Sequence, residues 1–156
     1  MPLQIGDQAP DVTLPAHDNQ QVSLGSLYGA QATVVVFFPL AFTSTCTEEL
    51  CTFRDDLADY NGLGAQVAAI SVDSPFVLDR FRKEIGADYL FLSDFNREAS
   101  RAFGVLRESP LGPGLRDVSD RSVFVVNPDR TVHYVWHSSN PSLLPPFDEI
   151  REALAA

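Results

Sequence analysis

The apolar positions along the chain predict alternating strands and helices. Residues 32–38 and 66–72 form two nearly continuous apolar runs, which predict strands buried on both faces of a sheet. Pro39 cannot donate to a strand ladder, so the first strand should end there. Apolar residues then recur three or four positions apart, which predicts a helix with one apolar face; these residues are Cys46, Leu50, Phe53, Leu57 and Tyr60.

The rest of the chain continues this alternation. Residues 11–24 predict a β-hairpin, and Pro75 suits the first turn of a helix that Gly86 closes. A mixed central sheet flanked by helices therefore accounts for the pattern, an α/β fold with an N-terminal hairpin and one domain over residues 1–156. The further strands are expected at 91–93, 122–126 and 131–137, the further helices at 98–103 and 147–155, and the longest loop at 107–117.

Composition and charge narrow the classes of function. With 156 residues and 45% apolar residues, the chain can bury one good core. Its formal net charge of −10 argues against nucleic-acid or anionic-membrane partners. The N-terminus has no signal-peptide pattern, and no run approaches the ~20 apolar residues of a membrane span. We therefore expect a cytoplasmic protein, in which two nearby cysteines indicate redox chemistry or metal binding before a structural disulfide.

Cys46 is the first candidate for chemistry, because it lies where the predicted helix begins. Thr43, Ser44 and Thr45 could each be the N-cap, and Thr45 with Glu48 fits a capping box. Each choice puts Cys46 in the first turn, where free N–H groups and the helix dipole favour a thiolate. A small cysteine that only packs on the apolar stripe is the alternative, and the pattern alone leaves both open.

Several motifs resemble those of the peroxiredoxins, thiol peroxidases with a thioredoxin-like fold. Pro39-x-x-x-Thr43-x-x-Cys46 matches the family signature, and Arg121 matches the arginine at the start of a late strand. The run 36–43 looks like the alkyl hydroperoxide reductase E type. Cys46-x4-Cys51 followed by Phe-Arg-Asp looks instead like the peroxiredoxin Q (bacterioferritin comigratory) type. The resemblance spans nearly the whole chain.

The resemblance implies a role for each matching residue. Cys46 is the peroxidatic thiolate, which attacks hydrogen peroxide or an organic hydroperoxide and becomes a sulfenic acid. Arg121 stabilises that thiolate and orients the peroxide. Thr43 hydrogen-bonds the peroxide, and Pro39 shields the site from water. Glu49 supports the arginine, although it could be only a favourable carboxylate in the first turn.

Cys51 is the candidate resolving cysteine. It lies about 140° around the helix from Cys46, off the apolar stripe, with no evident packing reason. In a regular helix the two Cα atoms are about 8.6 Å apart, beyond the reach of a disulfide. The peroxiredoxin Q resemblance implies that the helix unwinds, that Cys51 condenses with the sulfenic acid, and that a thioredoxin-like dithiol reduces the product.

Other functional interpretations stay open beside the two-cysteine cycle. The E-type resemblance favours a one-cysteine cycle, in which an external thiol resolves the sulfenic acid. A peroxide-sensing redox switch is an alternative from a different class of function, because it would not be an enzyme. Zinc binding by Cys46, Cys51, His133 and His137 is disfavoured, because the histidines are expected about 13 Å apart on one strand. No metal or organic cofactor is expected, and the chain is expected to be a monomer or a homodimer.

Overall fold

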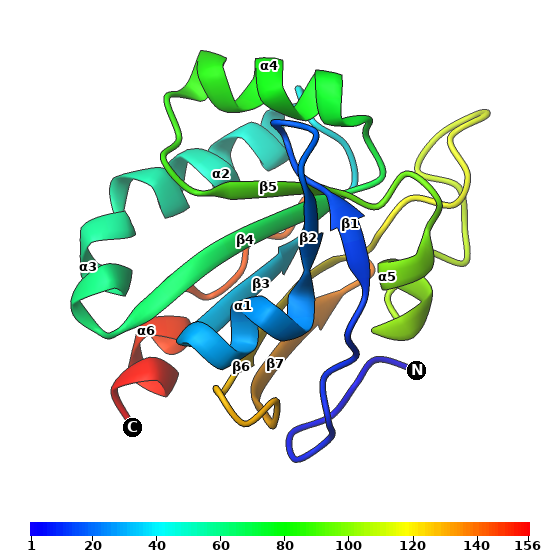
Figure 1. Cartoon of the computed structure of the whole chain (residues 1–156). Helices are drawn as coiled ribbons and strands as arrows, with labels where there is room; N and C mark the ends of the chain where they lie inside the picture. Colours follow the sequence, from blue (N-terminus) through cyan, green and yellow to red (C-terminus); the bar gives the residue numbers. More distant parts are fainter.

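The computed structural model describes residues 1–156, arranged as a five-stranded mixed sheet covered on both faces (Figure 1). The strand order is β5-β4-β3-β6-β7, in which β3, β4 and β5 are parallel, β6 runs antiparallel to them, and β7 is antiparallel to β6. A separate two-stranded hairpin, β1-β2, crosses the front of the sheet in Figure 1. The strands are β1 (Thr13–Pro15), β2 (Gln21–Ser23), β3 (Ala32–Phe37), β4 (Ala65–Ser71), β5 (Leu90–Ser93), β6 (Arg121–Val126) and β7 (Val132–Ser138).

Each face of the sheet has its own apolar core. Alternate residues of β3 point to opposite faces, so Val34 and Val36 join one cluster while Val35 and Phe37 join the other. Buried side chains of α2, α3, α4 and α6 complete the first cluster, and those of β1, α1 and α5 contribute to the second. The helices are α1 (Leu24–Ala30), α2 (Ser44–Asp55), α3 (Leu57–Gly62), α4 (Pro75–Ile85), α5 (Glu98–Ala102) and α6 (Phe147–Ala155).

The predicted mixed sheet, the hairpin and the order of the predicted elements are confirmed. Helix α1 is present in the structure but was not predicted. Residues 24–30 form a helix that the sequence pattern did not indicate. Gly25 and Gly29 lower the helix propensity of this short segment. The available signal was Ser23, whose side chain caps the helix by accepting from the amide of Ser26.

The prediction of one helix reaching Tyr60 is wrong. Helix α2 ends at Asp55, and Asp56 has φ −93° and ψ 4°, outside helical geometry, before α3 begins. At this break the carboxylate of Asp56 pairs with Arg151 of α6 at 2.6 Å. Tyr60 nevertheless stays in the core, where its ring lies 5.6 Å from that of Phe53.

The strand register brings two distant parts of the chain together at the start of α2. Phe37 at the end of β3 pairs with Ser122 in the antiparallel strand β6. One step further along the same register, Arg121 lies beside the loop that leads into α2. Because residues alternate along a strand, Arg121 shares a face with Val123 and Val125, which is the face that α2 covers.

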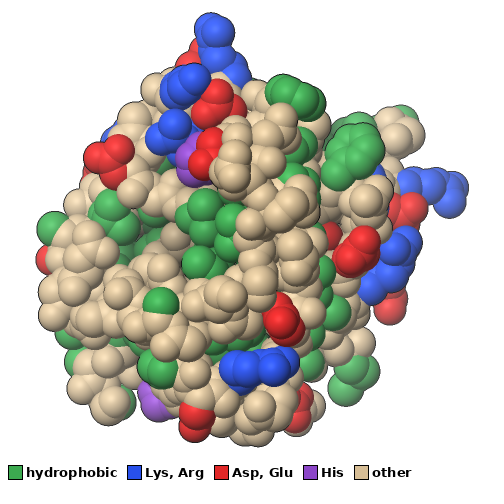
Figure 2. Space-filling model, viewed as in Figure 1, with side chains coloured by type: hydrophobic (Ala, Val, Ile, Leu, Met, Phe, Trp, Pro, Cys, Tyr) green, Lys and Arg blue, Asp and Glu red, His purple; other side chains and the backbone are tan.

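Charged side chains lie mainly around the edge of the face in Figure 2, and its centre shows mostly hydrophobic side chains together with the backbone and uncharged side chains. Acidic and basic groups are interspersed there, so the net charge of −10 does not form one acidic patch on this face. No helix combines the length and the apolar character needed to cross a membrane.

Candidate active site

The loop between β3 and α2 is fixed by a carboxylate at the end of the neighbouring strand. Asp73 accepts from the amide of Ala41 at 2.8 Å and from the hydroxyl of Ser71 at 2.6 Å. Phe42 has a φ of 69°, which is unusual for a bulky residue, and its half-exposed ring lies 5.1 Å from that of Phe81. These contacts set the direction in which α2 starts.

Cys46 is the third residue of α2, and it is buried with 1% of its surface exposed. The N-cap is Thr43, so the expected place of Cys46 in the first turn is confirmed. The expected capping box at Thr45 and Glu48 is wrong, because the helix begins two residues earlier. The Thr43 side chain does not cap either; its hydroxyl donates to the Leu40 carbonyl at 2.9 Å.

The start of α2 leaves several polar groups available near the sulfur. The amide of Thr47 donates to the Thr43 carbonyl at 2.9 Å, which makes it the first amide bonded within the helix. The amides of Ser44, Thr45 and Cys46 therefore precede the regular helix ladder. The partial positive charge of these groups favours an anion at the position of the sulfur.

Arg121 and Glu49 form a buried ion pair next to Cys46. Nη1 of Arg121 donates to Oε1 of Glu49 at 2.6 Å, and Nη2 donates to the Pro141 carbonyl at 2.7 Å. Burial raises the pKa of Glu49 to about 7, against the opposing charge and hydrogen bond of Arg121. Burial acts to lower the pKa of Arg121, but the charges of Glu49 and Cys46 outweigh it, so this pKa is raised.

A pocket of about 210 Å³ opens over the sulfur of Cys46. It brings together Pro39, Thr43, Cys46 and Arg121, four of the six residues singled out in the sequence. Glu49 lies behind Arg121 and does not line the pocket. The remaining lining residues are Ser44, Thr45, Leu111, Pro141 and Ser142.

Leu111, Pro141 and Ser142 are the pocket residues that sequence reasoning missed. Leu111 comes from the loop before β6, and Pro141 from the segment after β7. Pro141 acts through its backbone carbonyl, which every residue type carries, so no sequence signal marked it. The only hint in the sequence that Leu111 could line the site was its position in the predicted loop 107–117.

Cys51 is half-buried and packs against the same apolar cluster that contains Cys46. We expected that Cys51 would have no packing role, and this expectation is therefore wrong. The segment between α4 and β5 covers this side of α2, and its Tyr89 belongs to the same cluster. Both cysteines are free thiols here, and α2 is continuous across them, so the structure shows the helix in its folded state.

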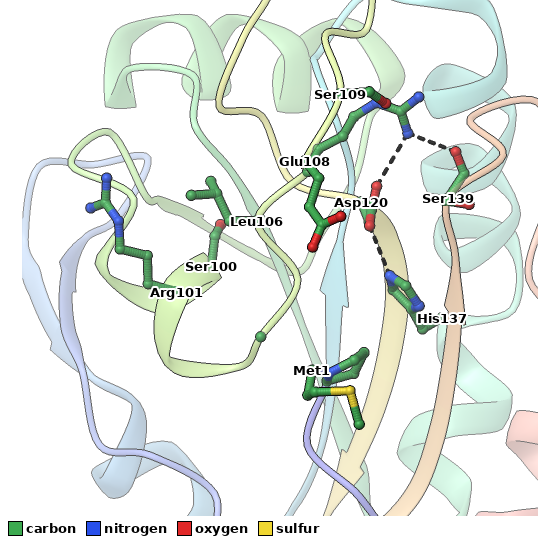
Figure 3. A pocket seen from close by; sticks show the side chains of 12 residues that line it. Met1, Ser100, Arg101, Leu106, Glu108, Ser109, Asp120, His137 and Ser139 are labelled. Atoms are coloured by element: carbon green, nitrogen blue, oxygen red, sulfur yellow. Dashed lines mark hydrogen bonds and ion pairs between the residues drawn. The ribbon is translucent and has the colours of Figure 1, made fainter.

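A larger cavity of about 750 Å³ shares no lining residue with the pocket at Cys46 (Figure 3). At its wall, Asp120 accepts from Arg107 at 3.1 Å and pairs with Nε2 of His137 at 2.8 Å. His133 instead contacts the Ala153 carbonyl at 2.9 Å. The two histidines thus have separate partners, and no group of three His, Cys, Asp or Glu residues is arranged to hold a metal ion.

The geometry around Cys46 suits attack on a polarised bond by sulfur. A nucleophile, a buried cation and a hydroxyl line one small pocket, and these are the groups that stabilise charge as such a bond breaks.

Comparison with known proteins shows the family to which the chain belongs. Residues 5–135 match the model of the AhpC/TSA family. The chain is 41% identical over 128 residues to a candidate peroxiredoxin of Mycobacterium tuberculosis, covering 81% of this chain and 80% of that protein. It is 33% identical over 135 residues to peroxiredoxin Bcp of Escherichia coli, covering 86% of each.

The relatives include both types that the motifs resemble. Alkyl hydroperoxide reductase E of Mycobacterium bovis is 35% identical over 127 residues, covering 80% of this chain and 79% of that protein. The crystal structure of peroxidoxin BcpB from Mycobacterium tuberculosis superposes with a TM-score of 0.84 at 30% identity, covering 97% of this chain and 96% of that one. The thioredoxin-like α/β fold is thereby confirmed. The chain belongs to the AhpC/TSA family and is a peroxiredoxin, a thiol-dependent peroxide reductase.

Proposed function

We propose that Cys46 is the peroxidatic cysteine of this peroxiredoxin. Its thiolate attacks the terminal oxygen of a hydroperoxide, so that an S–O bond forms as the O–O bond breaks. The leaving oxygen takes a proton and departs as water or an alcohol, and Cys46 becomes a sulfenic acid. The observation that carries this proposal is the shared pocket of the Cys46 sulfur and the buried Arg121 guanidinium.

The other pocket residues are assigned the roles that their positions support. Arg121 stabilises the thiolate and orients the peroxide, and Glu49 fixes the guanidinium from the side away from the pocket. The Thr43 hydroxyl already donates to Leu40, so its lone pairs remain free to accept from the O–H group of the peroxide. Pro39 is buried and has no N–H group, so it presents an apolar wall that excludes water.

We propose that Cys51 resolves the sulfenic acid. Its thiol displaces the sulfenic hydroxyl as water, which leaves a Cys46–Cys51 disulfide that a thioredoxin-like dithiol then reduces. Both cysteines lie in the intact helix α2, at the spacing whose Cα atoms are about 8.6 Å apart. Part of α2 must therefore unwind between the two chemical steps.

Steady-state peroxide consumption tests both halves of the proposal. Wild-type protein should turn over with thioredoxin and thioredoxin reductase, and Cys46→Ser should consume no peroxide. Cys51→Ser should complete one oxidation and then stop with thioredoxin as reductant. Sustained turnover of Cys51→Ser with a low-molecular-weight thiol, at the wild-type rate, would favour the one-cysteine cycle. A single stoichiometric oxidation of the wild type without turnover would favour a redox sensor.

A further inference from the structure

Two hydrogen bonds tie α2 to the stretch that runs from the last residue of α4 to the start of β5. The hydroxyl of Tyr89 donates to the Leu50 carbonyl at 2.5 Å. Nη1 of Arg54 donates to the Ile85 carbonyl at 2.6 Å. Tyr89 therefore contacts α2 directly beside Cys51, and the end of α4 contacts it one helical turn later.

The Tyr89 bond acts on the peptide group that carries Cys51. The carbonyl of Leu50 and the Cα of Cys51 belong to one planar peptide unit. Any movement of Cys51 out of the helix must rotate that plane and pull its oxygen away from the Tyr89 hydroxyl. The Leu50 carbonyl is also the normal acceptor for the amide four residues later, so the hydroxyl adds a second restraint to a group that the helix already satisfies.

Packing alone does not account for the hydroxyl. The ring of Tyr89 stacks on Phe91 with centroids 5.1 Å apart, and only 6% of the residue is exposed. A phenylalanine would fill the same space and make the same stacking contact. The hydroxyl therefore contributes the contact to α2 and little else.

We propose that Tyr89 is a positioning residue that holds Cys51 in the folded helix and slows its attack on the sulfenic acid. This inference rests on the proposed role of Cys51. The sulfenic acid has two fates: condensation with Cys51, which releases water, or reaction with a second hydroperoxide, which gives a sulfinic acid and water or an alcohol. By delaying the first reaction, Tyr89 sets how much peroxide the enzyme tolerates before Cys46 is lost to the sulfinic state.

Rapid-mixing measurements of Tyr89→Phe test this role. Disulfide formation after one equivalent of hydrogen peroxide should be roughly fivefold faster than in the wild type, the effect of one lost hydrogen bond. The peroxide concentration that converts half of Cys46 to sulfinic acid during turnover should rise by a similar factor. The rate of the first oxidation should not change, because Tyr89 does not line the pocket.

Tyr28→Phe is the matched control. Tyr28 is also fully buried, and its hydroxyl donates to the Pro10 carbonyl at 3.1 Å, but it lies in the cluster on the opposite face of the sheet. This variant loses the same kind of bond and should keep the wild-type rate of disulfide formation. A general loss of stability would affect both variants alike.

Equal or slower disulfide formation in Tyr89→Phe than in Tyr28→Phe contradicts the proposal. If Tyr89→Phe does not fold, Arg54→Met replaces it, since it removes the other hydrogen bond that restrains α2 from this side, to the Ile85 carbonyl at the end of α4. An unchanged rate of disulfide formation in Arg54→Met also contradicts the proposal. A wild-type protein that forms no disulfide at all would instead refute the role of Cys51. The two failures are therefore distinct.

Discussion

Nη1 of Arg121 donates to Oε1 of Glu49 at 2.6 Å, and the two side chains are 1% and 0% exposed. Glu49 is three residues after Cys46, so both lie on the face of α2 that meets β6. The Pro141 carbonyl holds the second nitrogen of the guanidinium at 2.7 Å. With two of its nitrogens fixed, the guanidinium cannot rotate away from the pocket in which Cys46 lies.

Replacing Arg121 by lysine should slow the reaction with peroxide strongly. An ammonium keeps the charge but cannot span Glu49, Pro141 and the sulfur with a planar fork of donors. We expect kcat/KM for hydrogen peroxide to fall roughly 10²-fold or more, the scale for a lost charge-stabilising group in an active site. Rapid-mixing kinetics of the first oxidation measures this directly.

Arg107→Lys is the control for that variant. Arg107 is also a largely buried arginine paired with a carboxylate, Asp120, but it lines the separate cavity of Figure 3. Cys46 of the Arg107→Lys variant should be oxidised by peroxide at the wild-type rate. If kcat/KM fell by a similar factor in both variants, the cause would be a general disruption by the lysine and not the position of Arg121.

Removing the Thr43 hydroxyl should also slow the first oxidation. Thr43→Val keeps the shape of the side chain but loses the oxygen that lines the pocket, so we expect kcat/KM to fall roughly 10²-fold. Thr43→Ser keeps the oxygen and should stay within a few-fold of the wild type. Thr52→Val serves as the control, because the Thr52 hydroxyl bonds only to the Glu48 carbonyl. Full activity in Thr43→Val would exclude a role for the hydroxyl.

The buried carboxyl of Glu49 predicts a specific pH dependence of stability. Its pKa is raised from 4.5 to about 7 by burial, so between these values the folded protein binds a proton that the unfolded chain has lost. The stability that this group contributes is therefore present below pH 4.5 and is lost as the pH rises through 7. Relative to Glu49→Gln, the wild-type free energy of unfolding should fall over this range by at most about 3 kcal/mol.

Urea unfolding at a series of pH values measures this difference. Glu48→Gln is the control, since Glu48 is the exposed neighbour on the same helix and should show the wild-type profile. A wild-type protein that instead gains stability over Glu49→Gln as the pH rises would show that the carboxyl titrates below its usual value, contrary to the prediction.

Much of the fold could be predicted because the strands carry strong local signals. The apolar runs that became β3 and β4, and the αL glycine Gly86 (φ 68°) that closes α4, mark their elements within a residue or two. Helix α1 was missed because Gly25 and Gly29 weaken its pattern. The break at Asp56 was missed because the helical spacing of apolar residues continues across it, from Phe53 through Leu57 to Tyr60.

The candidate site was predictable only where single side chains carry the chemistry. Pro39, Thr43, Cys46 and Arg121 could be named because they match the motifs of a known family, and they do line one pocket. The Pro141 carbonyl and the Tyr89–Leu50 bond could not, because they are backbone contacts created by tertiary folding. The packing of Cys51 was misjudged for the same reason, since the segment that covers it is distant in sequence.

The central claim is that Cys46 reacts with peroxide and that Cys51 resolves it within the same chain. Mass spectrometry of the reduced protein after one equivalent of hydrogen peroxide tests it most directly. We expect a loss of two hydrogen atoms from the intact chain and one peptide in which Cys46 is linked to Cys51. A stable sulfenic or sulfinic acid on Cys46 would contradict the resolving step, and an unmodified Cys46 would contradict the account as a whole.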